Sequence, residues 1–197
     1  MNELPRFRPQ PDHRFQFLQG FLTRPKEVGS IIPSSRFLER RVVRVADIRH
    51  ARTIVELGPG TGGTTRAILK AMAPQAHLLA IEINTRFARL LGRIPDRRLT
   101  VHEGSAAEIA EALSAHGLPP ADAILSGIPF STMPREQGLD ILRSVHDSLA
   151  PGGVFVAYQV RDRVEDLGRY VFGDAQVQTV MLNVPPMRVY RWRKSAA

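Results

Sequence analysis

Five short apolar segments recur along the chain after residue 50, each of a length that suits one buried strand. They lie near residues 53–57, 77–82, 98–102, 122–126 and 154–159. The segments between them have helical periodicity, from about Thr64 to Pro74, after Asn84 as N-cap, over 106–116, and from Pro134 to Leu149. Strands that alternate with helices in this way predict an α/β fold built on a doubly wound parallel sheet.

The two ends of the chain depart from this alternation. Residues 177–193 read as two strands separated by 183–186, which predicts a hairpin. The first fifty residues fit two helices, near 12–23 and 35–49. Residues 1–50 are therefore expected to form an N-terminal helical segment, and residues 51–197 a separate α/β domain.

A glycine-dense turn follows the first strand in the segment 53–65, TIVELGPGTGGTT. Gly58, Gly60 and Gly62 have no Cβ that would keep a ligand away from the backbone. Glu56 precedes the turn, and the second strand ends on Glu82, where a carboxylate can accept hydrogen bonds from a ribose diol. The spacing predicts an adenosine-containing cofactor. Because Gly58, Gly60 and Gly63 also match the G-x-G-x-x-G of nicotinamide-binding folds, the turn alone leaves two classes of cofactor open.

Charge and composition narrow the choice of partners. The 27 Lys and Arg residues exceed the 19 Asp and Glu residues, and the resulting net charge of +8 favours nucleic acid or an acidic membrane surface. The absence of cysteine excludes disulfides and thiol catalysis, and the six histidines lack paired-ligand spacing, so no metal site is expected. The N-terminus lacks the apolar core of a signal peptide, which predicts a cytoplasmic protein.

The helix expected near 12–23 is amphipathic. Five apolar residues share one broad arc of its helical wheel, and arginines and a lysine flank it. The apolar residues are Phe15, Phe17, Leu18, Phe21 and Leu22. Bulky apolar side chains beside cations are typical of a helix that lies on anionic lipid. A lid that packs the same phenylalanines against the cofactor pocket is the alternative, and the sequence leaves both open.

Several motifs together resemble the class I S-adenosylmethionine-dependent methyltransferases: E-L-G-P-G-T-G, the acidic strand end at Glu82, E-G-S-A at 103–106, and L-A-P-G-G at 149–153. The resemblance implies a seven-stranded Rossmann-like sheet whose last two strands form an edge hairpin, with S-adenosylmethionine as cofactor and S-adenosylhomocysteine as product. It also implies which residues contact the cofactor. They are Glu56, Gly58, Gly60 and Gly62 at the methionine part, Glu82 and Ile83 at the ribose, Ser105 and Ala106 at the adenine, Ser126 near the methyl group, and Ser30 and Ile31 as a cover.

The segment 122–130, DAILSGIPF, is expected to border the transferred methyl group, because the fourth strand of such a sheet ends at the crevice. R-P-K-E-V-G-S-I-I-P-S-S at 24–35 and S-G-I-P-F-S-T-M-P at 126–134 resemble the bacterial phospholipid N-methyltransferases. That resemblance implies methylation of phosphatidylethanolamine and its mono- and dimethylated forms toward phosphatidylcholine, at the inner face of the cell membrane. For such an acceptor, we expect the backbone of Ser126, Gly127 and Ile128, together with Tyr158, to orient the amine. Phe130 or Tyr158 is expected to contact the methylated cation, and Arg161 and Arg188, near predicted strand ends, to reach the phosphate.

A more distant resemblance is to the ribosomal RNA adenine dimethyltransferases, whose corresponding loop is Asn-Leu/Ile-Pro-Tyr/Phe. Gly127 stands in place of their Asn, and no room is expected after the last strand for the helical C-terminal domain of that family. Nucleic acid is therefore the less favoured partner. A non-catalytic cofactor-binding or membrane-tethering protein is a third possibility, but it would not need the loop at 126–130.

Overall fold

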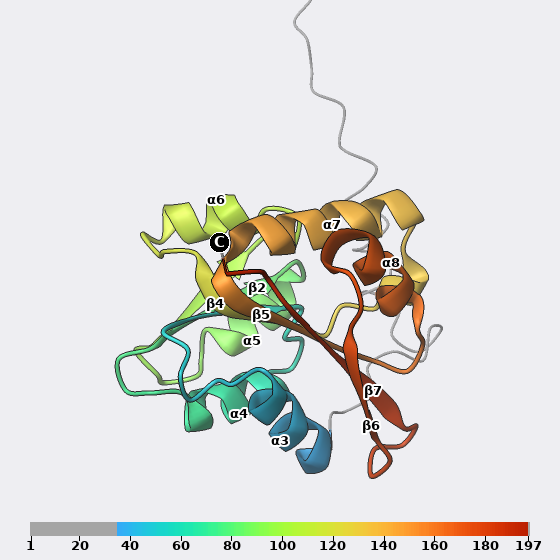
Figure 1. Cartoon of the computed structure of the whole chain (residues 1–197). Coiled ribbons are helices and arrows are strands. Elements are labelled where there is room, and N and C mark those ends of the chain that lie inside the picture. The colour runs from blue at the N-terminus through green and yellow to red at the C-terminus, as the bar shows by residue number, and fades with distance from the viewer. Residues whose placement is uncertain (1–34, 197) are drawn as a thin grey trace, which may run out of the picture.

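The computed structural model describes residues 35–196, which contain one seven-stranded sheet (Figure 1). Its strands run in the order β3-β2-β1-β4-β5-β7-β6. They are β1 (Thr53–Leu57), β2 (His77–Glu82), β3 (Leu99–Glu103), β4 (Ala121–Ser126), β5 (Leu149–Gln159), β6 (Gln176–Val180) and β7 (Met187–Arg193). The first five strands are parallel, whereas β7 pairs antiparallel with both β5 and β6. The doubly wound sheet and its edge hairpin are confirmed.

Helices cover both faces of the sheet and bury a hydrophobic core on each (Figure 1). One face carries α3 (Arg36–Val45) and α4 (Gly63–Ala71), with α5 (Thr85–Leu91) against β2 and β3. The opposite core includes residues of α6 (Ile109–Ala115), α7 (Arg135–Ser148) and α8 (Arg163–Phe172), and of the 3-10 turn η1 (Phe130–Thr132). The central strands β1, β2 and β4 and the second half of β5 are buried from both sides, which explains their apolar sequences, whereas β3 and β6 at the two edges of the sheet are more exposed.

Two predicted helices are shorter than expected. The helix predicted over 35–49 ends at Val45, because Asp47 adopts a left-handed conformation with a φ of 54° and stops it. The helix predicted over 106–116 begins only at Ile109, since Ser105 Oγ accepts a hydrogen bond from the Ala107 amide and forms a turn first. Asn84 caps α5 as predicted, by accepting hydrogen bonds from two backbone amides.

Helix α8 was not predicted, although its sequence carries helical signals. Its buried residues lie at positions i, i+3 and i+4, which is helical spacing: Val164, Leu167 and Gly168. Two acidic residues occupy the first turn. Acidic residues near a helix N-terminus stabilise the helix dipole. The predicted helix near 12–23, as well as Ser30 and Ile31, lies outside the described residues.

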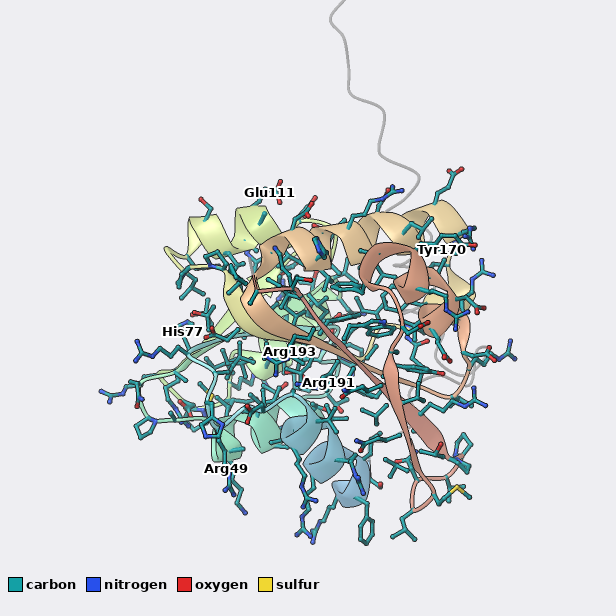
Figure 2. All side chains as sticks on the ribbon, in the orientation of Figure 1. Arg49, His77, Glu111, Tyr170, Arg191 and Arg193 are labelled. Carbon is teal, nitrogen blue, oxygen red and sulfur yellow. The ribbon has the colours of Figure 1, made fainter. Side chains whose placement is uncertain are left out.

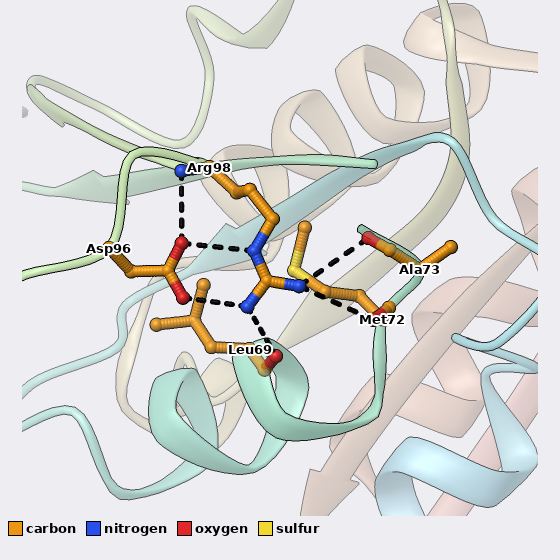
Figure 3. Close-up of polar contacts among 5 residues, drawn as sticks. All are labelled: Leu69, Met72, Ala73, Asp96 and Arg98. Carbon is orange, nitrogen blue, oxygen red and sulfur yellow. Dashed lines mark hydrogen bonds and ion pairs between the residues drawn. The ribbon is translucent and has the colours of Figure 1, made fainter. Parts of the chain in front are cut away.

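The C-terminal end of α4 is attached to the segment before β3 by one arginine (Figure 3). The Arg98 guanidinium donates to the backbone carbonyls of Leu69 at 2.7 Å, Met72 at 3.3 Å and Ala73 at 3.4 Å. It also pairs with Asp96 at 2.6 Å, and this pairing holds the pKa of Asp96 at about 2. Carbonyls at a helix C-terminus have no partner within the helix, so Arg98 satisfies groups that would otherwise need water.

The strand order reverses between β1 and β4, which makes the carboxyl ends of these two strands a topological switch point. Ligands of open α/β sheets bind in the crevice outside such a point. The glycine turn at 58–62 follows β1, and the segment 127–129 follows β4. Within residues 35–196, no helix is long and apolar enough to cross a bilayer.

Candidate active site

The turn after β1 uses glycine where the backbone requires it. Gly58, Gly60 and Gly62 have φ values of 67°, 56° and 82°, a region that other residues rarely adopt. A Cβ on Gly60 would meet no heavy atom within 4 Å, so this part of the turn faces open space. A Cβ on Gly58 would lie 3.1 Å from Ile128 Cγ1. Gly58 therefore lets the segment after β4 pack directly on the turn.

Glu56 is fully buried on β1 beside this turn. Its Oε2 accepts a hydrogen bond from Thr65 Oγ1 at 2.6 Å, while Oε1 has no hydrogen-bond partner among the described residues. Burial raises the pKa of Glu56 to about 8; the Thr65 hydrogen bond lowers it, and the Glu82 charge raises it further. Near neutral pH this side chain is therefore mostly protonated, with one oxygen available to a ligand.

Glu82 ends β2 and holds the glycine turn in place. Its Oε2 accepts from the Gly60 amide at 3.0 Å, and its Oε1 accepts from the Asn84 amide at 2.9 Å. Burial raises the pKa of Glu82, and these backbone hydrogen bonds oppose the rise. A carboxylate has about four acceptor sites, so it can still accept hydrogen bonds from a diol.

The end of β3 lies next to Glu82, because the Gly104 amide donates to the Glu82 carbonyl at 3.1 Å. Ser105 and Ile83 are half-buried there, and Ala106 is buried in the core beneath. The structure thus brings together the predicted cofactor residues on three neighbouring strand ends, from Glu56 to Ala106.

The segment after β4 packs against the glycine turn and against β5. Gly127 donates from its amide to the Leu57 carbonyl at 3.0 Å. A Cβ at this position would lie 2.8 Å from Tyr158 Oη and 3.3 Å from the Gly58 carbonyl oxygen. Ser126 is buried, and its Oγ accepts from the Ile128 amide at 3.3 Å. Glycine is therefore required at 127 by close contacts on two sides.

Tyr158 forms one wall of this arrangement. Its hydroxyl lies 3.2 Å from Thr64 Oγ1 at the start of α4, and its side chain is nearly buried. Burial raises the pKa of Tyr158, and the Glu56 charge raises it further. The phenol therefore stays neutral at physiological pH and acts as a hydrogen-bonding and steric group.

The Ile128 carbonyl is already used within the protein. It accepts from the Phe130 amide at 3.0 Å and from Gln159 Nε2 at the end of β5. A carbonyl oxygen has two lone pairs, so both are occupied. Of the three backbone carbonyls predicted to orient the amine, those of Ser126 and Gly127 are therefore the better candidates.

The three predicted lipid-binding residues occupy different environments. Phe130 is fully buried in the core under α7 and α8, a placement that favours support of the segment after β4 over contact with substrate. Arg161 is exposed just after β5. Arg188, the second residue of β7, lies opposite Gln159 and 3.7 Å from Asp162, and both charged side chains are substantially exposed.

Three polar residues of the site were missed by the sequence reasoning. Thr64 and Thr65 are buried at the start of α4, where they bind Tyr158 and Glu56. Gln159 is buried and binds the Ile128 carbonyl. Gln159 had a visible signal, since it is a polar residue that ends an apolar strand in the same way as Glu82 and Ser126.

Comparisons with known proteins agree with this geometry. Residues 55–155 match the family model of a methyltransferase domain. The chain is 36% identical over 143 residues to the ornithine lipid N-methyltransferase of Singulisphaera acidiphila, covering 72% of this chain and 74% of that protein. It is 35% identical over 94 residues to the ribosomal RNA small subunit methyltransferase A of Laribacter hongkongensis, covering 48% of this chain and 35% of that protein.

The fold is also found among solved structures. The 1,6-didemethyltoxoflavin-N1-methyltransferase of Burkholderia thailandensis, with bound S-adenosylhomocysteine, superposes with a TM-score of 0.68 at 15% identity. The superposition covers 98% of this chain and 93% of that one.

The chain therefore belongs to the methyltransferase-domain family and is a class I methyltransferase that uses S-adenosylmethionine. Its residues fit this cofactor. The Glu56 oxygen that has no partner within residues 35–196 suits an amino group, the space beside Gly60 admits a ligand against the backbone, and Glu82 retains acceptor sites for a ribose. The nicotinamide alternative left open by the glycine spacing is not the class to which the chain belongs.

Proposed function

We propose that this methyltransferase methylates the amine of a membrane lipid head group, with phosphatidylethanolamine and its mono- and dimethylated forms as substrates on the way to phosphatidylcholine. The observation that carries the proposal is similarity to a lipid N-methyltransferase over 72% of this chain and 74% of that relative. Ornithine lipid, named in that relative, is the second candidate acceptor.

The reaction is a transfer of methyl from sulfur to nitrogen, and bound S-adenosylmethionine supplies the electrophilic methyl group. Alignment of the acceptor is the main requirement for such an in-line displacement. We propose that Glu56, Gly58, Gly60 and Gly62 hold the methionine part of the cofactor. Glu82 and Ile83 would bind the ribose, Ser105 and Ala106 would lie at the adenine, and Ser126 would lie near the methyl group.

The amine must be neutral to react, because an ammonium has no lone pair. The carbonyls of Ser126 and Gly127 lie in the segment packed on the glycine turn, and we propose that they accept hydrogen bonds from the amine and direct its lone pair at the methyl group. Tyr158 lies on the opposite side of the proposed amine position, hydrogen-bonded to Thr64, and its ring would contact the methylated cation through cation–π attraction. The proton released from the amine passes to water.

The phosphate of the lipid requires a cationic partner. Arg161 and Arg188 are exposed at the end of β5 and the start of β7, next to Gln159, which binds the segment after β4. A guanidinium binds phosphate through charge-assisted hydrogen bonds. Arg188 would release Asp162 and bind the lipid phosphate instead, which would place the phosphate beside the end of β5 and the start of β7.

Residues 1–50 are proposed as the membrane-association and lid segment on the catalytic domain at 51–197, at the inner face of the cell membrane. Within this segment α3 is docked on the catalytic domain, since Leu38 and Val42 are buried in the core shared with α4.

RNA modification is the alternative, because several relatives are ribosomal RNA methyltransferases. The chain spans about a third of the length of these three relatives. Tyr158 and the Gly58 carbonyl lie close to Gly127 on two sides. A larger residue, such as the Asn of the ribosomal RNA adenine dimethyltransferases, therefore does not fit at position 127 unless these neighbours move.

The test is an acceptor comparison with labelled S-adenosylmethionine. Vesicles containing phosphatidylethanolamine, vesicles containing ornithine lipid, and ribosomal RNA are offered separately, with a Glu82→Ala variant as the background. Label in phosphatidylethanolamine is the expected result. Label in ornithine lipid alone would leave a lipid amine as substrate and reject phosphatidylethanolamine, whereas label in RNA alone would overturn the proposal.

A further inference from the structure

Large apolar side chains are exposed together at the loop between β6 and β7 and at the first turn of α3. Val184 is 90% exposed, Met181 69% and Leu182 65%, and Phe37 on α3 is 53% exposed. Single exposed apolar residues are ordinary, but a group of this size at one protruding loop marks an interaction surface. We name these four residues the apolar tip.

The loop that carries the tip is held firmly to α3. Asn183 is 1% exposed, and its Oδ1 accepts from the Ser35 amide at 3.0 Å while its Nδ2 donates to the Pro185 carbonyl at 3.0 Å. Arg41 on α3 donates to Gln178 on β6 at 2.9 Å. The polar side chain thus points inward and its apolar neighbours point outward, the reverse of the usual arrangement in a surface loop.

The tip lies at the same end of the sheet as the crevice, beyond the carboxyl ends of the parallel strands. In the antiparallel ladder, Gln159 at the end of β5 pairs with Arg188 at the start of β7. The loop at 181–186 therefore extends beyond the carboxyl ends of the parallel strands, where the glycine turn and the segment after β4 also lie (Figure 1). A surface that meets the tip is on the side where substrate must enter.

A cationic groove of about 1020 Å³ lies on the other side of α3, between α3 and α4. Six basic residues line it, against two acidic residues, Glu39 and Asp47. The basic residues are Arg36, Arg40, Arg44, Arg49, Arg66 and Lys70. Gly63, the first residue of α4, also lines the groove, so the groove begins next to the glycine turn. In Figure 2, Arg49 extends outward on the α3–α4 side, and Tyr170 lies on the α7–α8 side.

We propose that the apolar tip and the cationic groove form one docking face for an anionic lipid bilayer, with the tip inserted at the head-group level and the groove binding lipid phosphates. An apolar group flanked by cations is what an interfacial protein presents to anionic lipid. The apolar tip has no use in binding a nucleic-acid backbone, so charge and apolarity together select a membrane. This inference rests on the proposed lipid substrate, and it brings the crevice to the bilayer surface.

Because the chain has no cysteine, a single introduced cysteine can be labelled uniquely. Leu182→Cys carries an environment-sensitive fluorophore at the tip, and Arg143→Cys carries the same fluorophore on α7, on the opposite layer and 65% exposed. Both are mixed with vesicles of phosphatidylethanolamine and phosphatidylglycerol that contain a quencher on the lipid chains. A blue shift and quenching at position 182 alone are expected. Equal responses at both positions, or quenching at 143 alone, would overturn the docking face.

The groove is tested by the same substitution at two exposed arginines, one that lines the groove and one that lies outside it. A cation near an anionic surface contributes about 1 kcal/mol, so Arg40→Gln is expected to weaken vesicle partitioning about fivefold and Arg143→Gln to leave it unchanged. Thermal unfolding confirms that each variant is folded. Equal losses for the two variants would contradict a role for the groove.

The proposed function is measured separately, by methylation of phosphatidylethanolamine dispersed in detergent. If micellar lipid is methylated but the tip shows no insertion into vesicles, the docking face is wrong and the function stands. If micellar lipid is not methylated, the function itself fails.

Discussion

The substitution Gly127→Ala tests whether the segment after β4 is packed as tightly as the structure indicates. The added Cβ would lie 2.8 Å from Tyr158 Oη, 3.2 Å from Tyr158 Cζ and 3.3 Å from the Gly58 carbonyl oxygen. Tyr158 cannot retreat freely, because its ring is nearly buried and its hydroxyl is bound to Thr64. Overpacking of this kind costs about 1–3 kcal/mol.

That cost predicts a measurable loss of stability and a larger loss of activity. For a chain of this size, about 1–3 kcal/mol corresponds to a fall in Tm of roughly 2–12 °C. Methyl transfer is expected to fall by roughly 10- to 100-fold, because a displacement near 1 Å at the acceptor site spoils alignment. Differential scanning fluorimetry and single-turnover transfer of labelled methyl measure the two quantities.

The double substitution identifies the clash. Tyr158→Phe removes the atom that the new Cβ approaches most closely, so Gly127→Ala should cost about 1 kcal/mol less in the Tyr158→Phe background. Gly92→Ala is the matched control, since a Cβ there meets only ordinary contacts of 3.6 and 3.8 Å. If Gly127→Ala behaves like Gly92→Ala in both assays, or if its cost is the same in both backgrounds, the packing argument is refuted.

Three further predictions follow from buried or shared polar groups. The pKa of Glu56 is raised to about 8 in the folded, cofactor-free protein, whereas the carboxyl of the unfolded chain loses its proton near pH 4.5. Glu56 therefore destabilises the fold increasingly as pH rises from about 5 to 8. Glu56→Gln should therefore gain in Tm over the natural protein at pH 8 and not at pH 5, and bind cofactor more weakly by calorimetry; an equal Tm difference at both pH values would contradict this. Gln159→Leu should lower the rate of methyl transfer with little change in cofactor affinity, because the substitution removes the hydrogen bond that holds the Ile128 carbonyl in the segment after β4. A loss confined to cofactor binding would argue against this role of Gln159. Arg98→Lys should lower the Tm, since a lysine cannot match the fork that binds Asp96 and the end of α4, and an unchanged Tm would exclude this role.

The sequence predicted those features that depend on local pattern. Buried parallel strands read as apolar runs, and the glycine turn with Glu56 and Glu82 was visible because a close backbone approach and a strand-end carboxylate each leave a signature. Contacts between distant segments were not visible. The packing of Tyr158 on Gly127, the bond from Gln159 to the Ile128 carbonyl, and the burial of Phe130 all depend on how β4 and β5 lie side by side.

The membrane-facing features show the same division. The excess of positive charge was evident from composition, but the gathering of six basic residues between α3 and α4 arises only from helix packing. The outward placement of Leu182 and its neighbours likewise depends on the inward turn of Asn183, which a linear pattern does not reveal.

Helix α4 is fixed at both ends. Its first turn is joined to the glycine segment, which Glu82 holds through the Gly60 amide, and its last carbonyls are held by Arg98. A helix restrained in this way has little freedom to tilt, so we expect the exchange of spent for fresh cofactor to depend on movement elsewhere around the crevice. Substitutions at Arg98, far along the helix from the chemistry, should therefore speed product escape as well as loosen the fold.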